Sequence, residues 1–297
     1  MKSDFLDDYF KKKKIKYLRG LLFLSLIILL LFFLTKFTSK SNDFLARVEV
    51  HDVILDNKNL LNKIELLKSE EELKGIIVSI NSPGGTIVAS QELYKAFKSI
   101  GKKIPIVVSM KDVAASGGYM VSLASNKIYC YEGTLTGSIG VILQSANIEN
   151  LLSKLGIQPV IYKSGSLKAV PNPLEKVSNF GDSNIKTIIQ NMFDQFLGLV
   201  SEERKLSSQT KELISDGRVF TGLQAKEINL VDEIGTESDA IEWLKEFTNS
   251  PNDIKIIDMN KENKISSYFN ISFLKNFFKE NLIFTNGIFA LWYPYYE

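Results

Sequence analysis

Two short, continuous apolar segments constrain the fold of this chain more than any other feature. They are GIIVSI at residues 75–80 and IPIVVSM at residues 104–110. Such runs are typical of strands that are buried on both faces, as in the centre of a parallel sheet. Each run leads toward a turn with two glycines, NSPGG at 81–85 and ASGG at 115–118. The pattern predicts an α/β fold in which crossover helices connect the strands.

The other expected elements follow from the spacing of apolar residues. Periodic apolar positions predict one long amphipathic helix from about Ile185 to Val200. The aromatic-rich last 30 or so residues fit a core edge, an interface or a mobile tail. Further strands are expected at 46–55, 127–131, 139–143 and 157–163, and further helices at 59–74, up to Ile100, at 117–125 and at 147–155.

The N-terminus has the pattern of a membrane anchor. Six cationic residues within 11–19 precede an uncharged apolar run at 20–35. Residues 17–37 supply the roughly 20 helical residues that cross a bilayer, provided that the lysine and arginine side chains at both ends reach the interface. The basic flank predicts a cytoplasmic N-terminus, with the rest of the chain on the other side of the membrane. A cleaved signal peptide and a buried soluble helix are the alternatives.

Composition excludes several classes of function. The chain has 36 Lys and Arg against 34 Asp and Glu, a formal net charge of +2, so no nucleic-acid-binding surface is expected. The one cysteine, Cys130, excludes an intrachain disulfide framework and a cysteine-based metal site.

The two glycine turns define a candidate site. In an open α/β sheet, ligands bind at the carboxyl ends of the strands. If both turns face one crevice there, the backbone N–H groups of Gly85 and Gly117 can point at one oxyanion. Ser116 would lie at the start of a helix, with only small residues beside it. The alternative is a tight packing corner, since glycines mark turns in any protein.

A nucleophilic serine needs a base, and the residues leave its identity open. The only histidine, His51, fits an ordinary polar position in a strand better than a catalytic one. A lysine is protonated at its reference pKa of about 10.4 and must lose water contact to act as a base. Lys168 follows a predicted strand and a Gly turn and has apolar neighbours, although most lysines are solvated surface groups.

Six motifs in order resemble the bacterial signal peptide peptidase A family, also called protease IV, in its short single-domain form. The similarity runs from about Ala46 to Trp243. The motifs are INSPGG (80–85), DVAASGGYM (112–120), GTLTGSIGVI (133–142), KSGSLK (163–168), DGRVFTGLQA (216–225) and LVDEIG (230–235).

The resemblance implies the ββα-spiral fold shared by crotonases and the Clp protease subunit, here with an N-terminal transmembrane helix. It implies Ser116 as the nucleophile, Lys168 as the general base, and Gly85 and Gly117 as the oxyanion hole. Ser138 matches the serine that hydrogen-bonds the lysine and orients it.

One departure concerns the base. Ala169 follows Lys168 where the family often has an acidic or hydroxyl residue, and Lys163 in the same motif is the alternative base.

The implied domains are a cytoplasmic basic N-terminus at 1–16, an anchor at 17–37, a linker at 38–45, a peptidase domain at 46–258 and a C-terminal extension at 259–297.

The function implied is that of a membrane-anchored serine endopeptidase on the outer face of the bacterial cytoplasmic membrane. Its substrates would be cleaved signal peptides and other short or unfolded segments. Its expected partners are the membrane and further copies of itself, with neighbouring chains supplying the serine and the lysine of each site. No metal, cofactor or nucleic acid is implied. A crotonase-like acyl-CoA enzyme and a non-catalytic membrane scaffold of the same fold are the alternatives.

Overall fold

The computed structural model describes residues 13–14, 16–30, 42–260 and 289–291. The chain divides into two units, residues 1–42 and 43–297. Residues 16–30 of the first unit are helical. Within the described ranges, no helix is both long enough and apolar enough to cross a membrane. Part of the predicted anchor, residues 31–37, lies outside these ranges, as does most of the predicted C-terminal extension.

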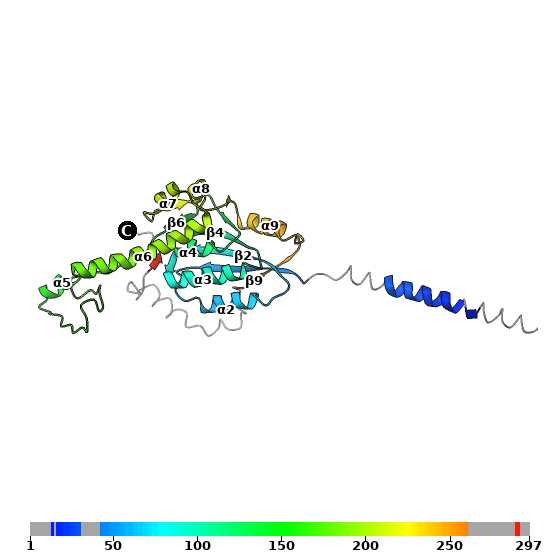
Figure 1. The fold of residues 1–297 in the computed structure, drawn as a ribbon, viewed down its shortest axis with the longest axis horizontal. Helices are drawn as coiled ribbons and strands as arrows, with labels where there is room; N and C mark the ends of the chain where they lie inside the picture. The colour runs from blue at the N-terminus through cyan, green and yellow to red at the C-terminus, as the bar shows by residue number, and fades with distance from the viewer. Residues whose placement is uncertain (1–12, 15, 31–41, 261–288, 292–297) are drawn as a thin grey trace, which may run out of the picture. The chain divides into compact units, whose positions relative to one another are not determined.

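A mainly parallel sheet forms the centre of the second unit (Figure 1). Strands β1 (Phe44–His51), β2 (Leu73–Ser82) and β4 (Ile106–Ala115) lie side by side and run parallel. The order across the sheet is β7-β6-β4-β2-β1-β9. The two apolar runs that mark the sequence form the buried parts of β2 and β4. The predicted α/β fold is confirmed.

The remaining strands are short and extend this sheet or pair beside it. Strand β4 forks, because its first half pairs with β5 and its last residues pair with β6. The last residues of β4 lead into the second glycine turn and are flanked by β2 and β6. The short strands are β3 (Gly84–Thr86), β5 (Lys127–Cys130), β6 (Leu135–Gly137), β7 (Val219–Thr221), β8 (Glu233–Ile234), β9 (Lys255–Asp258) and β10 (Phe289–Leu291).

Helices cover both faces of the sheet, and β2 shows how the sequence achieves this. Its residues Ile76, Val78 and Ile80 pack in one apolar cluster with residues of α2, α3 and α4. The alternate residue Ile77 packs in a second cluster with Leu244 of α9. Because successive side chains of a strand point to opposite faces, a continuous apolar run is required here. The four helices are α2 (Lys58–Leu67), α3 (Ile87–Ile100), α4 (Gly117–Ser122) and α9 (Glu237–Phe247).

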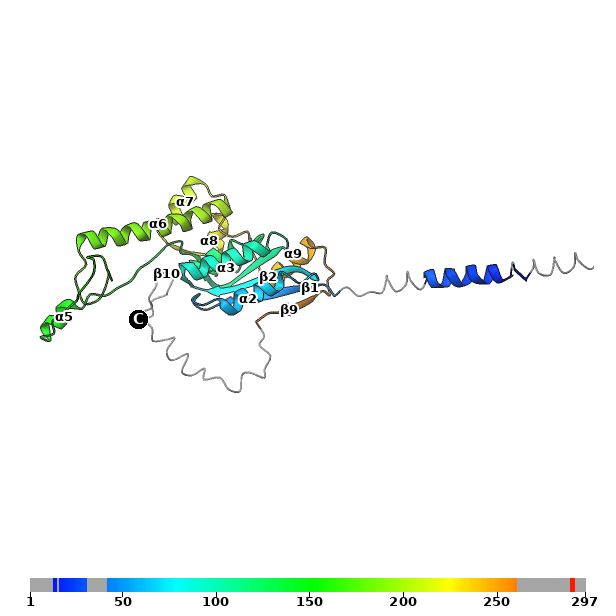
Figure 2. The same ribbon diagram turned by 60° about the horizontal axis from the view of Figure 1, so that its bottom comes forward.

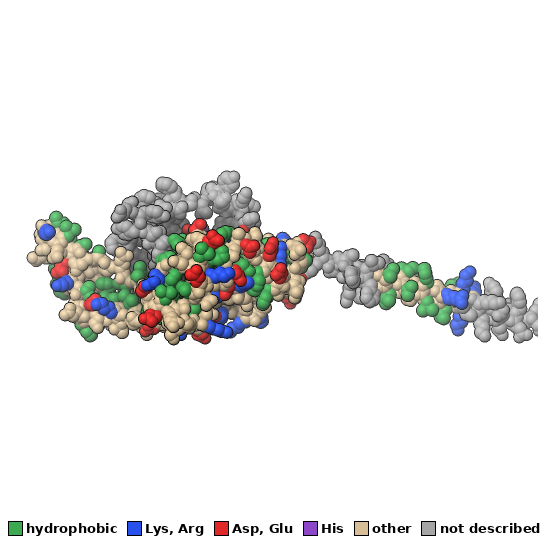
Figure 3. Space-filling view, turned by 90° about the horizontal axis from the view of Figure 1, so that it is seen from above, with side chains coloured by type: hydrophobic (Ala, Val, Ile, Leu, Met, Phe, Trp, Pro, Cys, Tyr) green, Lys and Arg blue, Asp and Glu red, His purple; other side chains and the backbone are tan. Residues whose placement is uncertain are grey.

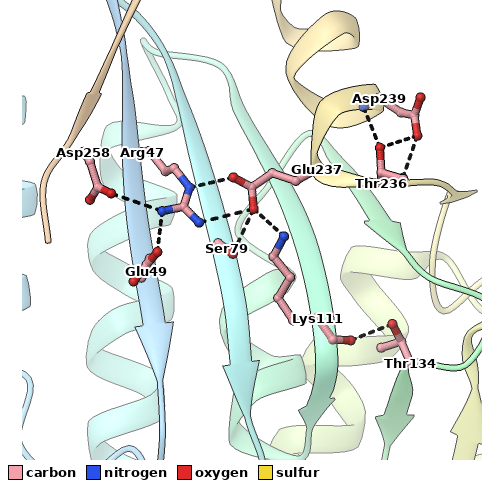
Figure 4. Close-up of polar contacts among 9 residues, drawn as sticks. All are labelled: Arg47, Glu49, Ser79, Lys111, Thr134, Thr236, Glu237, Asp239 and Asp258. Atoms are coloured by element: carbon pink, nitrogen blue, oxygen red, sulfur yellow. Dashed lines mark hydrogen bonds and ion pairs between the residues drawn. The ribbon is translucent and has the colours of Figure 1, made fainter.

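A network of charged side chains fastens α9 to the sheet (Figure 4). Glu237, the first residue of α9, accepts a 2.6 Å hydrogen bond from Nε of Arg47 on β1. It also pairs at 2.5 Å with Lys111 of β4 and accepts a hydrogen bond from Ser79 of β2. Arg47 extends the network to Asp258 of β9. One carboxylate therefore connects α9 to three strands.

Residues 142–180, called the arm below, project from the sheet together with the start of α6 in both ribbon views (Figures 1 and 2). The predicted long helix is confirmed as α6, whose residues Phe196 and Val200 are buried against the core. The arm instead exposes many apolar side chains, some of which form patches at its end of the molecule in Figure 3. They are Ile142, Leu151, Leu155, Ile157, Val160, Ile161, Tyr162, Leu174 and Phe180. The helices of this half are α5 (Glu149–Lys154), α6 (Asn179–Arg204), α7 (Ser208–Ile214) and α8 (Gly222–Glu227).

Two predicted strands are wrong. The strand expected at 139–143 lies earlier, as β6, because Gly137 and Ser138 have positive φ angles of 80° and 48° and turn the backbone out of the sheet. The segment 157–163 forms no strand, since it lies on the arm, away from the strands whose backbone groups could pair with it. Strand β1 begins at Phe44, within the predicted linker. The other domain boundaries stay a prediction.

Candidate active site

Ser116 lies at the point where β4 ends and α4 begins. Its backbone has φ 52° and ψ −115°, a conformation that non-glycine residues rarely adopt. Two backbone hydrogen bonds hold it there: its N–H donates to the carbonyl of Gly137 at 2.8 Å, and its carbonyl accepts from Met120 at 2.9 Å. The turn therefore fixes the direction of the Ser116 side chain at some energetic cost, as is common at functional sites.

The hydroxyl of Ser116 is buried and has no hydrogen-bond partner among the described residues. The residue is 1% exposed, and its Oγ contacts no donor or acceptor within the part of the chain that the structure describes. It does not cap α4. Burying an unsatisfied hydroxyl costs about 1–3 kcal/mol, so such groups are uncommon in native proteins. A free, oriented hydroxyl of this kind is what a nucleophile requires.

The two glycine turns lie next to each other, as the sequence predicts. A Cβ added to Gly118 would lie 2.6 Å from the carbonyl oxygen of Ser82, the last residue of β2. A Cβ added to Gly85 would lie 1.9 Å from the carbonyl oxygen of Ile54. Only glycine fits at either position, since real Cβ atoms essentially never come within 3.0 Å of such a neighbour. The glycines are needed for close backbone packing, and the same packing brings β3 beside α4.

The N–H groups of the two expected oxyanion donors take no part in the hydrogen bonds within α4 or between β3 and Ile54, and Gly85 pairs instead with Ala290 of β10. Gly117 is the first residue of α4, and the first N–H groups of a helix have no partner within it. In β3, the Gly84 carbonyl and the Thr86 N–H bond Ile54, so the groups of Gly85 between them point to the opposite edge.

Ser138 lies close to Ser116 through the backbone. Its neighbour Gly137 accepts the hydrogen bond from the Ser116 N–H, while the Ser138 N–H donates to the carbonyl of Arg218 at 2.9 Å. Ser138 is 9% exposed. The TGSIG motif therefore lies directly beside Ser116 through the pairing of β6 with the end of β4.

The chain does not bring Lys168 to Ser116. Lys168 lies in a turn on the arm, exposed, with its N–H donating to Gly165 at 3.0 Å. The apolar neighbours expected to remove water from it do not bury it within one chain. The alternative base, Lys163, forms an ion pair with Glu175. His51 is the last residue of β1 and is exposed, with Nε2 3.8 Å from Asp52.

Two supporting residues were not singled out in the sequence. The carbonyl of Gly137 accepts the hydrogen bond from the Ser116 N–H, and the positive φ of 80° at Gly137 explains why a glycine stands there. Tyr119 is fully buried behind α4, where its hydroxyl donates to the Leu230 carbonyl at 2.7 Å. Burial raises the pKa of Tyr119, so its hydroxyl stays neutral and remains a donor. Both lie within recognised motifs, but no local pattern gives their roles.

No metal-binding cluster occurs in the described ranges: no three His, Cys, Asp or Glu side chains gather there as ligands could. The site consists of a buried serine beside two glycine turns with backbone N–H donors, a combination suited to acyl transfer.

Comparison with known proteins identifies the family of this chain. The model of Peptidase family S49 matches residues 98–250, more than half of the chain, and the Clp protease model matches residues 45–134. A protein of Enterococcus faecium named as a signal peptide peptidase, SppA, is 36% identical over 69% of this chain and 64% of its own length. A protein of Synechocystis named as a protease is 37% identical over 70% of this chain and 75% of its own length.

Two solved structures are similar at lower identity. A membrane-bound stomatin-specific protease has a TM-score of 0.49 and 14% identity, covering 74% of this chain and 99% of its own. ClpP1 from Listeria monocytogenes has a TM-score of 0.43 and 20% identity, covering 66% and 94%. The family match and the two sequence relatives establish that the chain belongs to peptidase family S49.

Proposed function

We propose that this chain is a serine endopeptidase in which Ser116 is the nucleophile. The observation that carries the proposal is the Ser116 hydroxyl, which is buried, unpartnered among the described residues and held in a rare backbone conformation. Membership of peptidase family S49 supports the same reaction. The fold that we propose is the Clp-like ββα spiral, which the match of residues 45–134 to the Clp protease model supports.

The proposed reaction is acyl transfer to Ser116, with a lysine as base and two backbone N–H groups as oxyanion donors. Oγ of Ser116 attacks the carbonyl carbon of a peptide bond while a neutral amine, that of Lys168, takes the hydroxyl proton. The carbonyl oxygen becomes an oxyanion and accepts hydrogen bonds from the N–H groups of Gly85 and Gly117. Collapse of the tetrahedral intermediate expels the amine product, which receives the proton from the lysine. Water then hydrolyses the acyl-enzyme with the same base.

The base is supplied by a second copy of the chain. Lys168 lies exposed on an arm that carries apolar side chains, and the Ser116 hydroxyl has no partner of its own in the described ranges. Association through the arm would bury these apolar groups and remove water from the lysine, which favours the neutral amine. Ser138 is proposed to orient that amine.

The proposed substrates are cleaved signal peptides and other short or unfolded segments, as the name of the Enterococcus relative suggests. The proposed location is the outer face of the cytoplasmic membrane, with residues 17–37 as anchor. Release of the full-length chain from membranes by a carbonate wash would contradict the anchor.

Peptide cleavage by the purified full-length chain tests the function. Ser116→Ala and Lys168→Ala are expected to lower kcat by at least about a thousandfold, because each removes one partner of the proton transfer. Lys176→Ala is the control, since Lys176 is another exposed lysine of the arm. Cleavage by either dyad variant at the wild-type rate would overturn the proposal.

A further inference from the structure

The loop that carries Lys168 is closed at its base by one carboxylate. Residues 164–171, called the lysine loop below, lie on the arm between Lys163 and Asn172. Oε1 of Glu175 forms an ion pair with Nζ of Lys163 before the loop and accepts a 2.7 Å hydrogen bond from Nδ2 of Asn172 after it. A single carboxylate oxygen therefore joins the two ends of the lysine loop.

Asn172 also holds the backbone next to Lys168. Its Nδ2 donates to the carbonyl of Ala169 at 3.1 Å, and its Oδ1 accepts from the Leu174 N–H at 2.9 Å. Ala169 has a φ of 59°, in the left-handed region that costs a residue with a side chain about 1–2 kcal/mol. The Lys168 N–H donates to the Gly165 carbonyl at 3.0 Å. Hydrogen bonds therefore fix the backbone on both sides of Lys168.

The segment around Glu175 is itself attached to the start of α5. The Glu175 carbonyl accepts a hydrogen bond from Nδ2 of Asn147 at 3.2 Å. The Pro173 carbonyl accepts one from the N–H of Ile148 at 2.9 Å. Oδ1 of Asn147 in turn accepts from the N–H of Glu149, the first residue of α5. This segment is thus a fixed frame from which the lysine loop extends.

The ion pair at the base of the loop is partly shielded from water, unlike the lysine that the loop presents. The side chain of Lys163 is 15% exposed and that of Glu175 is 33% exposed, whereas Lys168 is exposed. A catalytic base must lie within hydrogen-bonding reach of its proton, and a displacement of about 1 Å can cost a hundredfold in rate. The shape of the loop therefore matters for any role of Lys168 as a base.

We propose that Glu175 is a positioning residue for the reaction. Through Lys163 and Asn172 it holds the lysine loop in the shape that presents the Lys168 amine to Ser116 of a neighbouring copy. Lys163 is then the ion-pair partner of Glu175 and not a base. The role in the reaction rests on the proposed function, whereas the closure of the loop rests on the contacts within one arm.

Two variants of the full-length chain separate an ion-pair partner from a base at Lys163. Arginine can pair with Glu175 but stays protonated in proteins, and methionine can neither pair nor accept a proton. We expect kcat for peptide cleavage to stay within about threefold of wild type in Lys163→Arg and to fall at least about tenfold in Lys163→Met, with KM unchanged within about twofold in both. A Lys163→Arg chain as slow as Lys163→Met would overturn the proposal.

Trypsin cleavage after Lys168 measures the order of the loop without relying on the activity of the chain. It is followed in full-length chains that also carry Ser116→Ala, so that only trypsin cuts. We expect Glu175→Gln to raise the rate of cleavage after Lys168 at least about fivefold, because the loop loses the ion pair at its base. Glu149→Gln, which removes an exposed carboxylate from the same arm, should leave the rate unchanged. Cleavage after Lys154, in the last turn of α5, is the internal control.

Peptide cleavage by the same variants with Ser116 intact completes the test. We expect Glu175→Gln to lower kcat at least about tenfold and Glu149→Gln to stay within about twofold of wild type. Equal trypsin cleavage after Lys168 in the two variants would overturn the closure of the loop, and faster cleavage with an unchanged kcat would overturn the positioning role. If no chain cleaves peptides while the difference in trypsin cleavage persists, the proposed function fails and the closure of the loop by Glu175 stands.

Discussion

Two features of Ser116 lower the stability of the fold and have no evident structural benefit. Its backbone lies in a rarely populated region, and its hydroxyl is buried without a partner among the described residues. The small residues around Ser116 are visible in the sequence, but its φ angle is not. The Ser116 N–H bonds the carbonyl of Gly137, which is distant in the chain, and no local pattern reveals this contact. Natural proteins keep such destabilising features where activity requires them.

Replacing Ser116 with Ala is expected to separate stability from activity. The change removes a buried, unsatisfied hydroxyl and leaves the backbone conformation as it is. The free energy of unfolding should therefore stay the same or rise by up to about 1 kcal/mol, while peptide cleavage is lost. Denaturant unfolding and a peptide assay on the same preparation check both. A clear loss of stability would show that the hydroxyl has a structural partner.

Replacing Gly85 is expected to lower the free energy of unfolding. A Cβ at this position would lie 1.9 Å from the Ile54 carbonyl oxygen, so Gly85→Ala must displace β3. We expect the free energy of unfolding to fall by at least about 2 kcal/mol. Gly133→Ala is the matched control, because nothing lies within 4 Å of its added Cβ, and its change should stay within about 0.5 kcal/mol. Equal stability of the two variants would contradict the close packing described for β3.

At the scale of elements, the sequence predicted what depends on apolar periodicity. The buried runs of β2 and β4 and the long helix α6 have strong patterns, and each was recognised. The short strand β6 was misplaced because its end is set by positive φ angles at Gly137 and Ser138, which apolar periodicity does not reveal. The segment 157–163 has a strand-like composition, yet within the described ranges no strand pairs with it. The network around Glu237 could not be predicted from the sequence, since its members come from distant segments.

The attachment of α9 should depend on pH through Glu237. Burial raises the pKa of this carboxyl, but hydrogen bonds from Arg47 and Lys111 outweigh burial and lower it to about 2. A carboxylate with a lowered pKa stabilises the fold above its unfolded pKa of about 4.3, and this stability is lost as the pH falls toward 2. Glu237→Gln should therefore be less stable than wild type by about 1–2 kcal/mol near neutral pH, since the network keeps some contact with water.

Unfolding by denaturant across a pH series measures this difference, which should shrink below about pH 4. Glu246→Gln is the control on the same helix, at an exposed position. A stability difference that does not change with pH would mean that Glu237 acts by packing rather than by charge.

At the scale of the whole molecule, the single chain does not bring all of the predicted site residues together. It brings the serine, the glycine turns and Ser138 together, while Lys168 stays on the exposed arm. The sequence resemblance implied a base from a neighbouring chain, whereas local chemistry could only nominate a lysine. No pattern within one chain can specify a contact made between chains, and so the geometry of the complete dyad stays a prediction.

Mixing two inactive variants tests the shared site. If Ser116 and Lys168 come from different copies, co-assembled Ser116→Ala and Lys168→Ala chains contain some intact pairs. With equal amounts and random order, about a quarter of the sites should be active, and cleavage should return to about that level. A mixture that stays inactive, although native mass spectrometry shows mixed oligomers, would place both residues of the dyad in one chain.

The most direct test of the central claim is the covalent labelling of Ser116. The intact, assembled chain is treated with a fluorophosphonate, and the modified residue is located by peptide mass spectrometry. We predict a single adduct on Ser116 that forms at least about a hundredfold more slowly in Lys168→Ala and at the wild-type rate in Lys176→Ala. An adduct on another residue, or equal labelling in Lys168→Ala, would contradict it.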